Sequence, residues 1–234
     1  VGGPHGTAMA EVVHDIAPNA ELVLVCISTE VEYLEALQGL AAENVDMVVS
    51  GLGWLLSGAG DGTGFIDEAV DAAIDTNGWL WVQPAGNQTQ RHWLGDWIDA
   101  DANDWLEWSG EAYNAVHVNG GDTLRLGLVW EDAWGAAEAD FELVVTDSSG
   151  ELVAWTDSPA ASFGDPTRYL KIEGLTAGEY RIYVFRRDNG YDTPTLQLYG
   201  YDHDLDMAVA SQSLMEPADL DSVLTTGAVS ITSE

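Results

Sequence analysis

Positive charge is scarce in this sequence. Its 234 residues include seven lysines and arginines against 40 aspartates and glutamates, which gives a formal net charge of −33 at pH 7. Lys171 is the single lysine. A nucleic-acid-binding protein neutralises phosphates with cationic side chains, and docking on anionic membranes also depends on such side chains. The charge balance therefore excludes nucleic acid as a partner and argues against docking on anionic membranes.

Cysteine and long apolar runs are also lacking. Cys26 stands alone, which excludes an internal disulfide framework and a thiolate zinc site. No apolar run approaches the ~20 residues of a membrane span, and the first residues do not resemble a signal peptide, so we expect no membrane insertion. Hydrophobic residues nevertheless make up 46% of the chain, which is enough for a substantial core.

The acid excess has two interpretations. Excess aspartate and glutamate favour solubility in any acidic secreted protein. Alternatively, the protein is adapted to high salt, where dissolved ions screen the repulsion between carboxylates. The scarcity of lysine accompanies the acid excess and is consistent with the second interpretation, but neither one identifies an activity.

The first 90 residues alternate between helical and strand-like patterns. Apolar residues at helical spacing predict helices over 5–17, 30–43 and 65–75, and short apolar runs predict buried strands over 21–27, 46–50 and 79–83. Strands that are apolar on both faces and alternate with helices indicate a parallel sheet covered on two sides.

The pattern changes after residue 90. Short alternating runs separated by turns predict strands over 123–130, 141–145, 180–185 and 195–199, which is typical of an antiparallel β-sandwich. The segment 222–229 again has the pattern of a buried strand of a parallel sheet. We therefore expect a sandwich over 91–206 that interrupts an α/β part formed by 1–90 and 207–234, with the strand at 222–229 beside that at 79–83.

Four sequence motifs occur in an informative order. His5-Gly6-Thr7 begins a predicted helix that is followed by Ala-Pro-Asn-Ala at 17–20. The strand at 46–53 ends in Ser-Gly-Leu-Gly, Pro-Ala-Gly-Asn occupies 84–87, and Glu-Pro-Ala at 216–218 precedes the strand at 222–229. Together they resemble the histidine motif and the following segments of subtilisin-like serine proteases (subtilases), with Gly51 replacing a serine of the family's Ser-Leu-Gly.

The resemblance implies a fold of the α/β class. It implies a partial subtilisin-like parallel sheet with helices on both faces and an inserted antiparallel β-sandwich. The sandwich is itself similar to small β-sandwich modules attached to secreted proteases, notably at 140–144 and 177–180. A secreted or extracellular location follows from the same resemblance.

The resemblance also implies roles for individual residues. His5 corresponds to the general base that removes the serine proton and returns it to the leaving amine. Asn87 corresponds to the side-chain amide that donates to the oxyanion. A polypeptide substrate in extended form would pair with a substrate-binding edge formed by Gly51, Leu52, Gly53, Ala85 and Gly86.

Two members of the subtilase triad are not found in the sequence. The family orders the triad as Asp, His, Ser, but only four residues precede His5, and no serine motif follows the strand at 222–229. We therefore expect a middle portion of a subtilase that is inactive alone and whose partners are the remaining portions of the parent protease. The alternative is an inactive pseudo-protease or a binding module whose sandwich engages a polymer or a cell-surface partner.

Two further patterns admit binding roles. Asp202, Asp204 and Asp206 alternate and would share one face of an extended strand, which suits calcium, and Asp132 and Asp140 flank a Trp-Gly pair. The spacing of a calcium-binding loop is absent, so no cofactor or metal is required, with calcium left as an alternative. The tryptophans over 93–108 either stack on sugars or pack between the sandwich and the protease portion.

The charge predicts that folding depends on salt. Repulsion among the carboxylates opposes compaction, and salt shortens the reach of this repulsion from ~10 Å at 0.1 M to ~3 Å at 1 M. We expect the melting temperature to rise from low salt to molar KCl, as measured by circular dichroism. A melting temperature that stays constant or falls over this range would contradict adaptation to high salt.

Overall fold

The fold was analysed in a computed structural model that describes residues 4–157, 164–188 and 192–229. The chain forms two compact units. The first consists of Val1–Gly86 and Leu214–Glu234, and the second of Asn87–Ser213. Among the described residues, no helix combines the length and the apolar character needed to cross a membrane.

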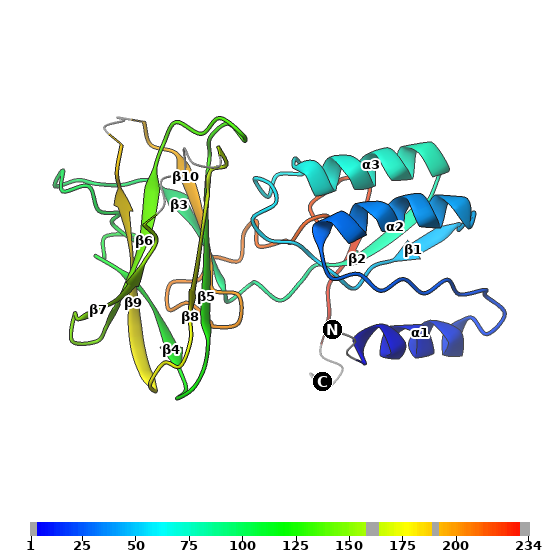
Figure 1. Ribbon diagram of the computed structural model, residues 1–234, viewed down its shortest axis with the longest axis horizontal. Coiled ribbons are helices and arrows are strands. Elements are labelled where there is room, and N and C mark those ends of the chain that lie inside the picture. The colour runs from blue at the N-terminus through cyan, green and yellow to red at the C-terminus, as the bar shows by residue number, and fades with distance from the viewer. Residues whose placement is uncertain (1–3, 158–163, 189–191, 230–234) are drawn as a thin grey trace. The chain divides into compact units, whose positions relative to one another are not determined.

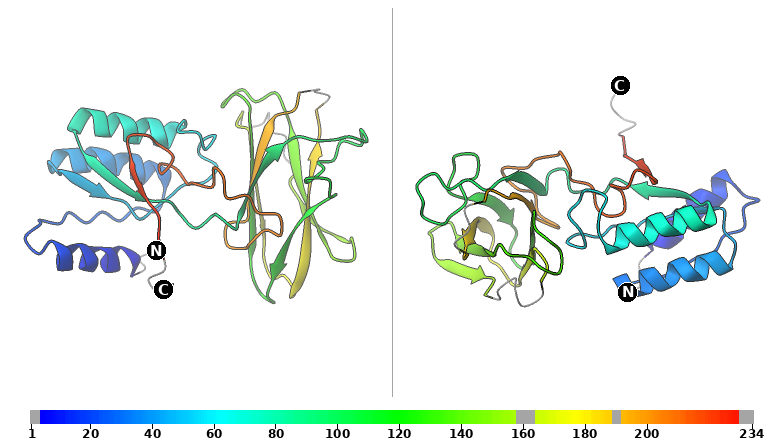
Figure 2. Two further views of the ribbon diagram at one scale, coloured as in Figure 1. Left: turned by 180° about the vertical axis from the view of Figure 1, so that it is seen from behind. Right: turned by 90° about the horizontal axis from the view of Figure 1, so that it is seen from above.

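The first unit contains three helices and a small parallel sheet. The helices are α1 (His5–Ile16), α2 (Glu30–Ala42) and α3 (Phe65–Asn77). The sheet has the order β1 (Met47–Val49), β2 (Leu80–Pro84) and β11 (Leu224–Thr226). Helices α2 and α3 lie side by side on one face of this sheet (Figure 1), and α1 lies on the other side (Figure 2).

Local sequence determines where α2 begins and where α3 ends. Thr29 and Glu32 form a capping box, in which each side chain accepts a hydrogen bond from the backbone N–H of the other, so α2 begins at Glu30. Helix α3 ends at Gly78, whose φ of 70° is in the left-handed region that glycine tolerates. Both helices bury apolar side chains with Trp81 of β2, and this packing forms the core of the unit.

This sheet joins a strand near the C-terminus to a strand that precedes the second unit in the sequence. β11 pairs with β2 in parallel, with Leu224 opposite Val82 and Thr226 opposite Pro84. The predicted neighbourhood of 222–229 and 79–83 is therefore present, although the whole second unit lies between these segments in the sequence.

The prediction for residues 21–27 is wrong. No strand forms there, and the apolar side chains are exposed, with Leu24 at 73%. A strand that is apolar on both faces needs packing against both, but residues 22–25 stay exposed, and among the described strands β1 pairs with β2 alone, so none pairs with this segment. Helix α1 likewise buries none of its side chains.

The second unit is a pair of antiparallel sheets. One has the order β3 (His92–Asp96), β10 (Thr195–Tyr199), β5 (Leu124–Trp130) and β8 (Thr167–Ile172). The other has the order β4 (Asn114–Val118), β9 (Gly178–Arg186), β6 (Phe141–Asp147) and β7 (Leu152–Trp155). Alternate residues of these strands point inward and form one apolar core between the sheets.

The predicted fold class, α/β, is wrong for the chain as a whole. Eight of the eleven strands in the described residues belong to antiparallel sheets, and three helices accompany them, so the protein is mostly β. The parallel sheet has three short strands and is not a clear subtilisin-like layout. The sequence patterns overestimate the parallel sheet because 21–27 resembles a strand. They underestimate the antiparallel part because they do not predict β3, β4, β7 and β8.

We expect residues 87–213 to fold when produced alone. Hydrogen bonds connect the two ends of this segment, from Val209 N to His92 O (2.7 Å) and from Leu205 N to Gln90 O (2.8 Å), and the core is its own. The expected result is a β-type circular dichroism spectrum with one cooperative thermal transition. A spectrum of an unfolded chain at molar KCl, where the intact protein is folded, would refute this prediction.

Candidate functional site

His5 is the first residue of α1 and lies beside the glycine segment, residues 51–53, that follows β1. Its Nε2 atom is 3.2 Å from the backbone oxygen of Gly51, and its side chain is exposed. The imidazole is thus accessible and held near the carboxyl end of β1. This is the edge at which α/β sheets carry their ligand sites.

Gly51 is required by the close approach of α1. A Cβ atom at this position would lie 2.4 Å from Sδ of Met9 and 2.7 Å from Nε2 of His5. Both distances are shorter than van der Waals contact, so a serine here would force the two side chains away. The observed position of the His5 ring therefore requires that residue 51 carries no side chain.

Met215 connects two of the predicted substrate-binding glycines. A Cβ at Gly53 would lie 2.7 Å from Cε of Met215, and one at Gly86 would lie 2.9 Å from the same atom. The methionine side chain thus occupies the space between the glycine segment and the end of β2. Met215 could not be predicted as a residue of the site, because a methionine before Glu-Pro-Ala matches no sequence motif.

Leu52 and Ala85 are held by their backbones. The buried amide of Gln83 donates from Nε2 to the oxygen of Leu52, and the Leu52 side chain is 40% exposed. The N–H of Ala85 donates to the oxygen of Thr226 at 2.9 Å, which continues the pairing of β2 with β11. Both residues therefore belong to the same edge of the sheet as Gly51.

Among the described residues, Asn87 is connected with this group only by its peptide bond to Gly86. It follows Gly86, is exposed, and is the first residue of the second unit. The structure brings His5 to Gly51, and Gly53 to Gly86 through Met215. It shows Asn87 joined to this group by its peptide bond to Gly86.

Three carboxyl groups are wholly or partly buried in the first unit, one on α3 and two in the segment before β11. Asp67, in the first turn of α3, has no exposed surface, and among the described residues neither of its side-chain oxygens has a hydrogen-bond partner. Glu216 is 3% exposed, and its Oε2 has no partner in the same part of the chain. Asp219 accepts a hydrogen bond from Gly62 N at 2.9 Å and leaves Oδ1 unpaired.

Burial dominates the protonation of these groups. Desolvation, followed by the charges of Asp219 and Asp61, raises the pKa of Asp67 to about 7. Desolvation and the surrounding acids, Asp67 first, raise the pKa of Glu216 to about 9. Burial also raises the pKa of Asp219. Glu216 is therefore protonated and uncharged at neutral pH.

The first unit has no lysine or arginine that could pair with these acids. Every lysine and arginine of the sequence lies between Arg91 and Arg187, in the second unit. The buried cluster could not be predicted from the sequence, because Asp67 has the pattern of a favourable acid in a first helical turn and Glu216 belongs to the Glu-Pro-Ala motif.

The aspartates proposed for calcium do not form a joint site. Asp202 pairs with Arg125, Asp204 with Arg91 at 3.2 Å, and Asp206 lies 3.4 Å from His117. These residues form turns instead of an extended strand, so their side chains do not share a face. Across the described ranges, no group of three metal-ligating side chains lies close enough to hold an ion.

The second pair of acids has other partners. Asp132 accepts hydrogen bonds from the backbone N–H groups of Glu138 and Ala139, each at 2.8 Å. Asp140 forms an ion pair with Arg168.

The tryptophan cluster divides into two kinds of residue. Trp93, Trp97 and Trp108 are buried in the core of the second unit, so the expected packing between the sandwich and the protease portion is replaced by packing inside the sandwich. Trp105 is partly exposed and lines a cavity.

Comparison with solved structures gives one informative match. The CspB protease of Clostridium perfringens is similar with a TM-score of 0.60 at 13% sequence identity, over 90% of this chain and 49% of that chain. The overall fold is therefore similar to that of a bacterial protease, and the chain spans about half the length of that protein.

Two other structures cover about half of this chain. They are the pre-peptidase C-terminal domain of a collagenase from Bacillus anthracis (15% identity, 50% of this chain and 94% of that one, TM-score 0.30) and a mitogen from Yersinia pseudotuberculosis (14% identity, 51% and 85%, TM-score 0.27). These scores do not establish a shared fold. No protein-family model matches the chain, and no curated protein matches its sequence.

The buried acids predict a stability that falls with rising pH. Between the ordinary pKa of glutamate (4.5) and the folded value of about 9, the folded state holds the Glu216 proton while the unfolded state has lost it. The contribution of Glu216 is therefore complete below pH 4.5 and is lost as the pH rises towards 9. Asp67 acts in the same direction between 3.8 and about 7.

Glu216→Gln tests this prediction, because glutamine has the same shape and never ionises. We expect its free energy of unfolding to exceed that of the wild type at pH 9 and its pH dependence to be flatter, as measured by denaturant titration from pH 5 to 9 in molar KCl. Glu173→Gln, at an exposed acid in the second unit, is the control and should leave the slope unchanged. Parallel pH profiles for the wild type and Glu216→Gln would contradict a protonated Glu216.

Proposed function

We propose that this chain is part of a secreted subtilisin-like serine endopeptidase and carries its general base, His5, and an oxyanion donor, Asn87. The observation that carries the proposal is the contact of the exposed His5 ring with Gly51, at the segment where the resemblance places the substrate cleft. Similarity of the overall fold to a bacterial protease supports it.

In the proposed reaction, the neutral imidazole of His5 removes the proton of a serine hydroxyl as the oxygen attacks the peptide carbonyl. The protonated ring then returns the proton to the leaving amine. The amide of Asn87 donates a hydrogen bond to the oxyanion of the tetrahedral intermediate. The serine and the aspartate that orients His5 belong to remaining portions of the parent protease, which are the proposed partners of this chain.

The substrate is a polypeptide in extended conformation. Its backbone would pair along Gly51, Leu52 and Gly53, with Ala85 and Gly86 on the opposite side. Met215 occupies the space between Gly53 and Gly86 and so limits the size of the substrate side chain there. Hydrolysis by this route requires no cofactor or metal.

A second candidate function has its own supporting observation. The β-sandwich has a cavity lined by aromatic and acidic side chains, which is a feature of a binding module. In this alternative the protease-like part is inactive, and the sandwich binds a polymer or a cell-surface partner.

The proposal predicts that the 234-residue chain alone does not hydrolyse peptides. Without the nucleophile, at most a small residual rate remains from oxyanion stabilisation and binding. A casein assay and a peptide-nitroanilide assay should show no turnover above buffer. Turnover abolished by a serine-directed inhibitor would refute the assignment of the missing groups.

A longer protein distinguishes the two functions. If the parent reading frame has an Asp-Thr-Gly-like strand upstream and a Gly-Thr-Ser-Met-Ala motif downstream, His5→Ala should lower kcat by roughly 10³-fold or more, and Asn87→Ala by about 10²–10³-fold. A parent that has both motifs but is unaffected by His5→Ala would overturn the role of His5. A parent without them would favour the binding module.

A further inference from the structure

The second unit has a cavity on the outer face of the sheet that contains β6 and β9. Val144 and Tyr183 lie opposite each other on these strands and point away from the core, which is formed by the alternating residues. The segment 99–112 borders this face: its backbone continues the sheet beside β9, with Leu106 N donating to Val184 O at 2.9 Å and Trp105 opposite Phe185. The open cavity between them has a volume of about 570 Å³, within the usual range of ligand sites.

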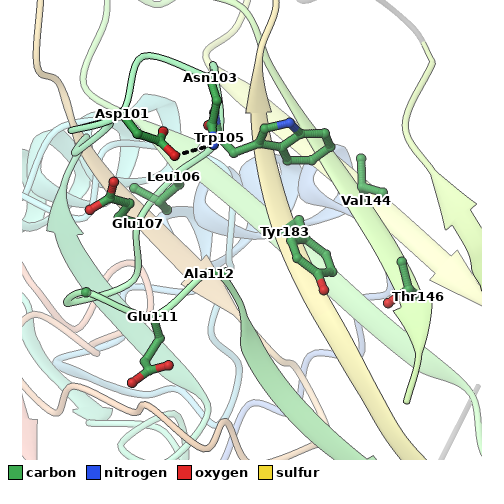
Figure 3. A pocket seen from close by; sticks show the side chains of 11 residues that line it. Asp101, Asn103, Trp105, Leu106, Glu107, Glu111, Ala112, Val144, Thr146 and Tyr183 are labelled. Atoms are coloured by element: carbon green, nitrogen blue, oxygen red, sulfur yellow. Dashed lines mark hydrogen bonds between the residues drawn. The ribbon is translucent and has the colours of Figure 1, made fainter. Parts of the chain in front are cut away.

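The lining has an acidic side and an aromatic side. Figure 3 shows the carboxylates of Asp101, Glu107 and Glu111 on one side and the rings of Trp105 and Tyr183 on the other. The two rings meet edge to face, with centroids 6.0 Å apart, and both are partly exposed. No lysine or arginine lines the cavity.

The protein's own cations are engaged elsewhere. Each of the seven lysines and arginines forms an ion pair with an acid outside the cavity: Arg91–Asp204, Arg125–Asp202, Arg168–Asp140, Lys171–Glu173, Arg181–Glu179, Arg186–Asp188 and Arg187–Glu142. None of the ion pairs among the described residues includes an acid of the cavity. In the same part of the chain, Asp101 and Glu107 accept hydrogen bonds only from neutral donors, the side-chain amide of Asn103 and the N–H of Ala100, so a cationic ligand would not have to displace an ion pair.

The same sheet face shows how such a cation binds. The guanidinium of Arg181, two residues before Tyr183, lies 4.7 Å from the ring centroid of Tyr113 and donates to Glu179 at 2.8 Å. This arrangement combines a cation–π contact with a charged hydrogen bond. The cavity beside it offers the same two elements, rings and carboxylates, without a cation.

We propose that this cavity binds an arginine or lysine side chain of a polypeptide, with the cationic group between the carboxylates and the face of Trp105 or Tyr183. The three carboxylates favour a cation over a neutral sugar, which would need a balance of donors and acceptors. The site lies within the second unit and does not depend on the peptidase proposal.

The test is an NMR titration of the full chain at fixed ionic strength with the tripeptide acetyl-Gly-Arg-Gly-amide. The neutral comparison is the same peptide with citrulline, which has nearly the shape of arginine without its charge. We expect saturable shifts of the Trp105 and Tyr183 ring resonances and a dissociation constant at least about fivefold higher for the citrulline peptide.

Two double variants separate the cavity from the general charge of the protein. Glu107→Gln with Glu111→Gln should raise the dissociation constant for the arginine peptide about fivefold. Glu131→Gln with Glu138→Gln changes the net charge equally at exposed positions outside the cavity and should change it less than twofold.

Three results would overturn the proposal. They are equal weakening by the two double variants, equal affinity for the two peptides, and absence of saturable binding. Shifts of the same resonances by a neutral trisaccharide, without shifts by the arginine peptide, would assign the cavity to a sugar instead.

Discussion

The distribution of seven positive charges determines how this protein is held together. All seven lie in the β-sandwich, and each is paired with a carboxylate. The two most buried pairs are Arg186 with Asp188 and Arg168 with Asp140, and removal of either arginine would leave an uncompensated carboxylate. The first unit has no lysine or arginine, so a buried acid there is neutralised by a proton or remains costly. The two units therefore solve the same electrostatic problem by different means.

Much of the local structure was predictable because it depends on patterns that neighbouring residues carry. The three helices begin and end within two residues of the predicted limits, since a capping box and a left-handed glycine mark two of these ends. β11 was found beside β2 because a strand that is apolar on both faces needs a covered sheet. The same reasoning failed at 21–27, where the pattern is equally apolar but no described strand pairs with it. A pattern indicates what a segment needs and leaves open whether that need is met.

Only those residues of the candidate site that belong to a recognisable sequence motif could be predicted. His5 and Gly51 were each predicted as site residues from a motif, but their contact was not, because it depends on the approach of α1 to the segment after β1. Met215, Asp67 and Glu216 were missed because their positions depend on contacts between distant segments. Asp67 looks like an ordinary acid of a first helical turn, and its complete burial is a property of the packing around it.

The buried acids and the glycine segment are mechanically connected. Trp54, the residue after Gly53, exchanges two backbone hydrogen bonds with Glu216, at 2.9 and 3.1 Å. Met215, directly before Glu216, packs against Gly53 and Gly86. Ionisation of Glu216 would place an unpaired charge beside Gly58 and Gly64, with no lysine or arginine in the unit to compensate it. Its escape towards water would pull on the bridge to Trp54 and on Met215 together. The geometry of the proposed cleft therefore depends in part on the protonated carboxyl group of Glu216.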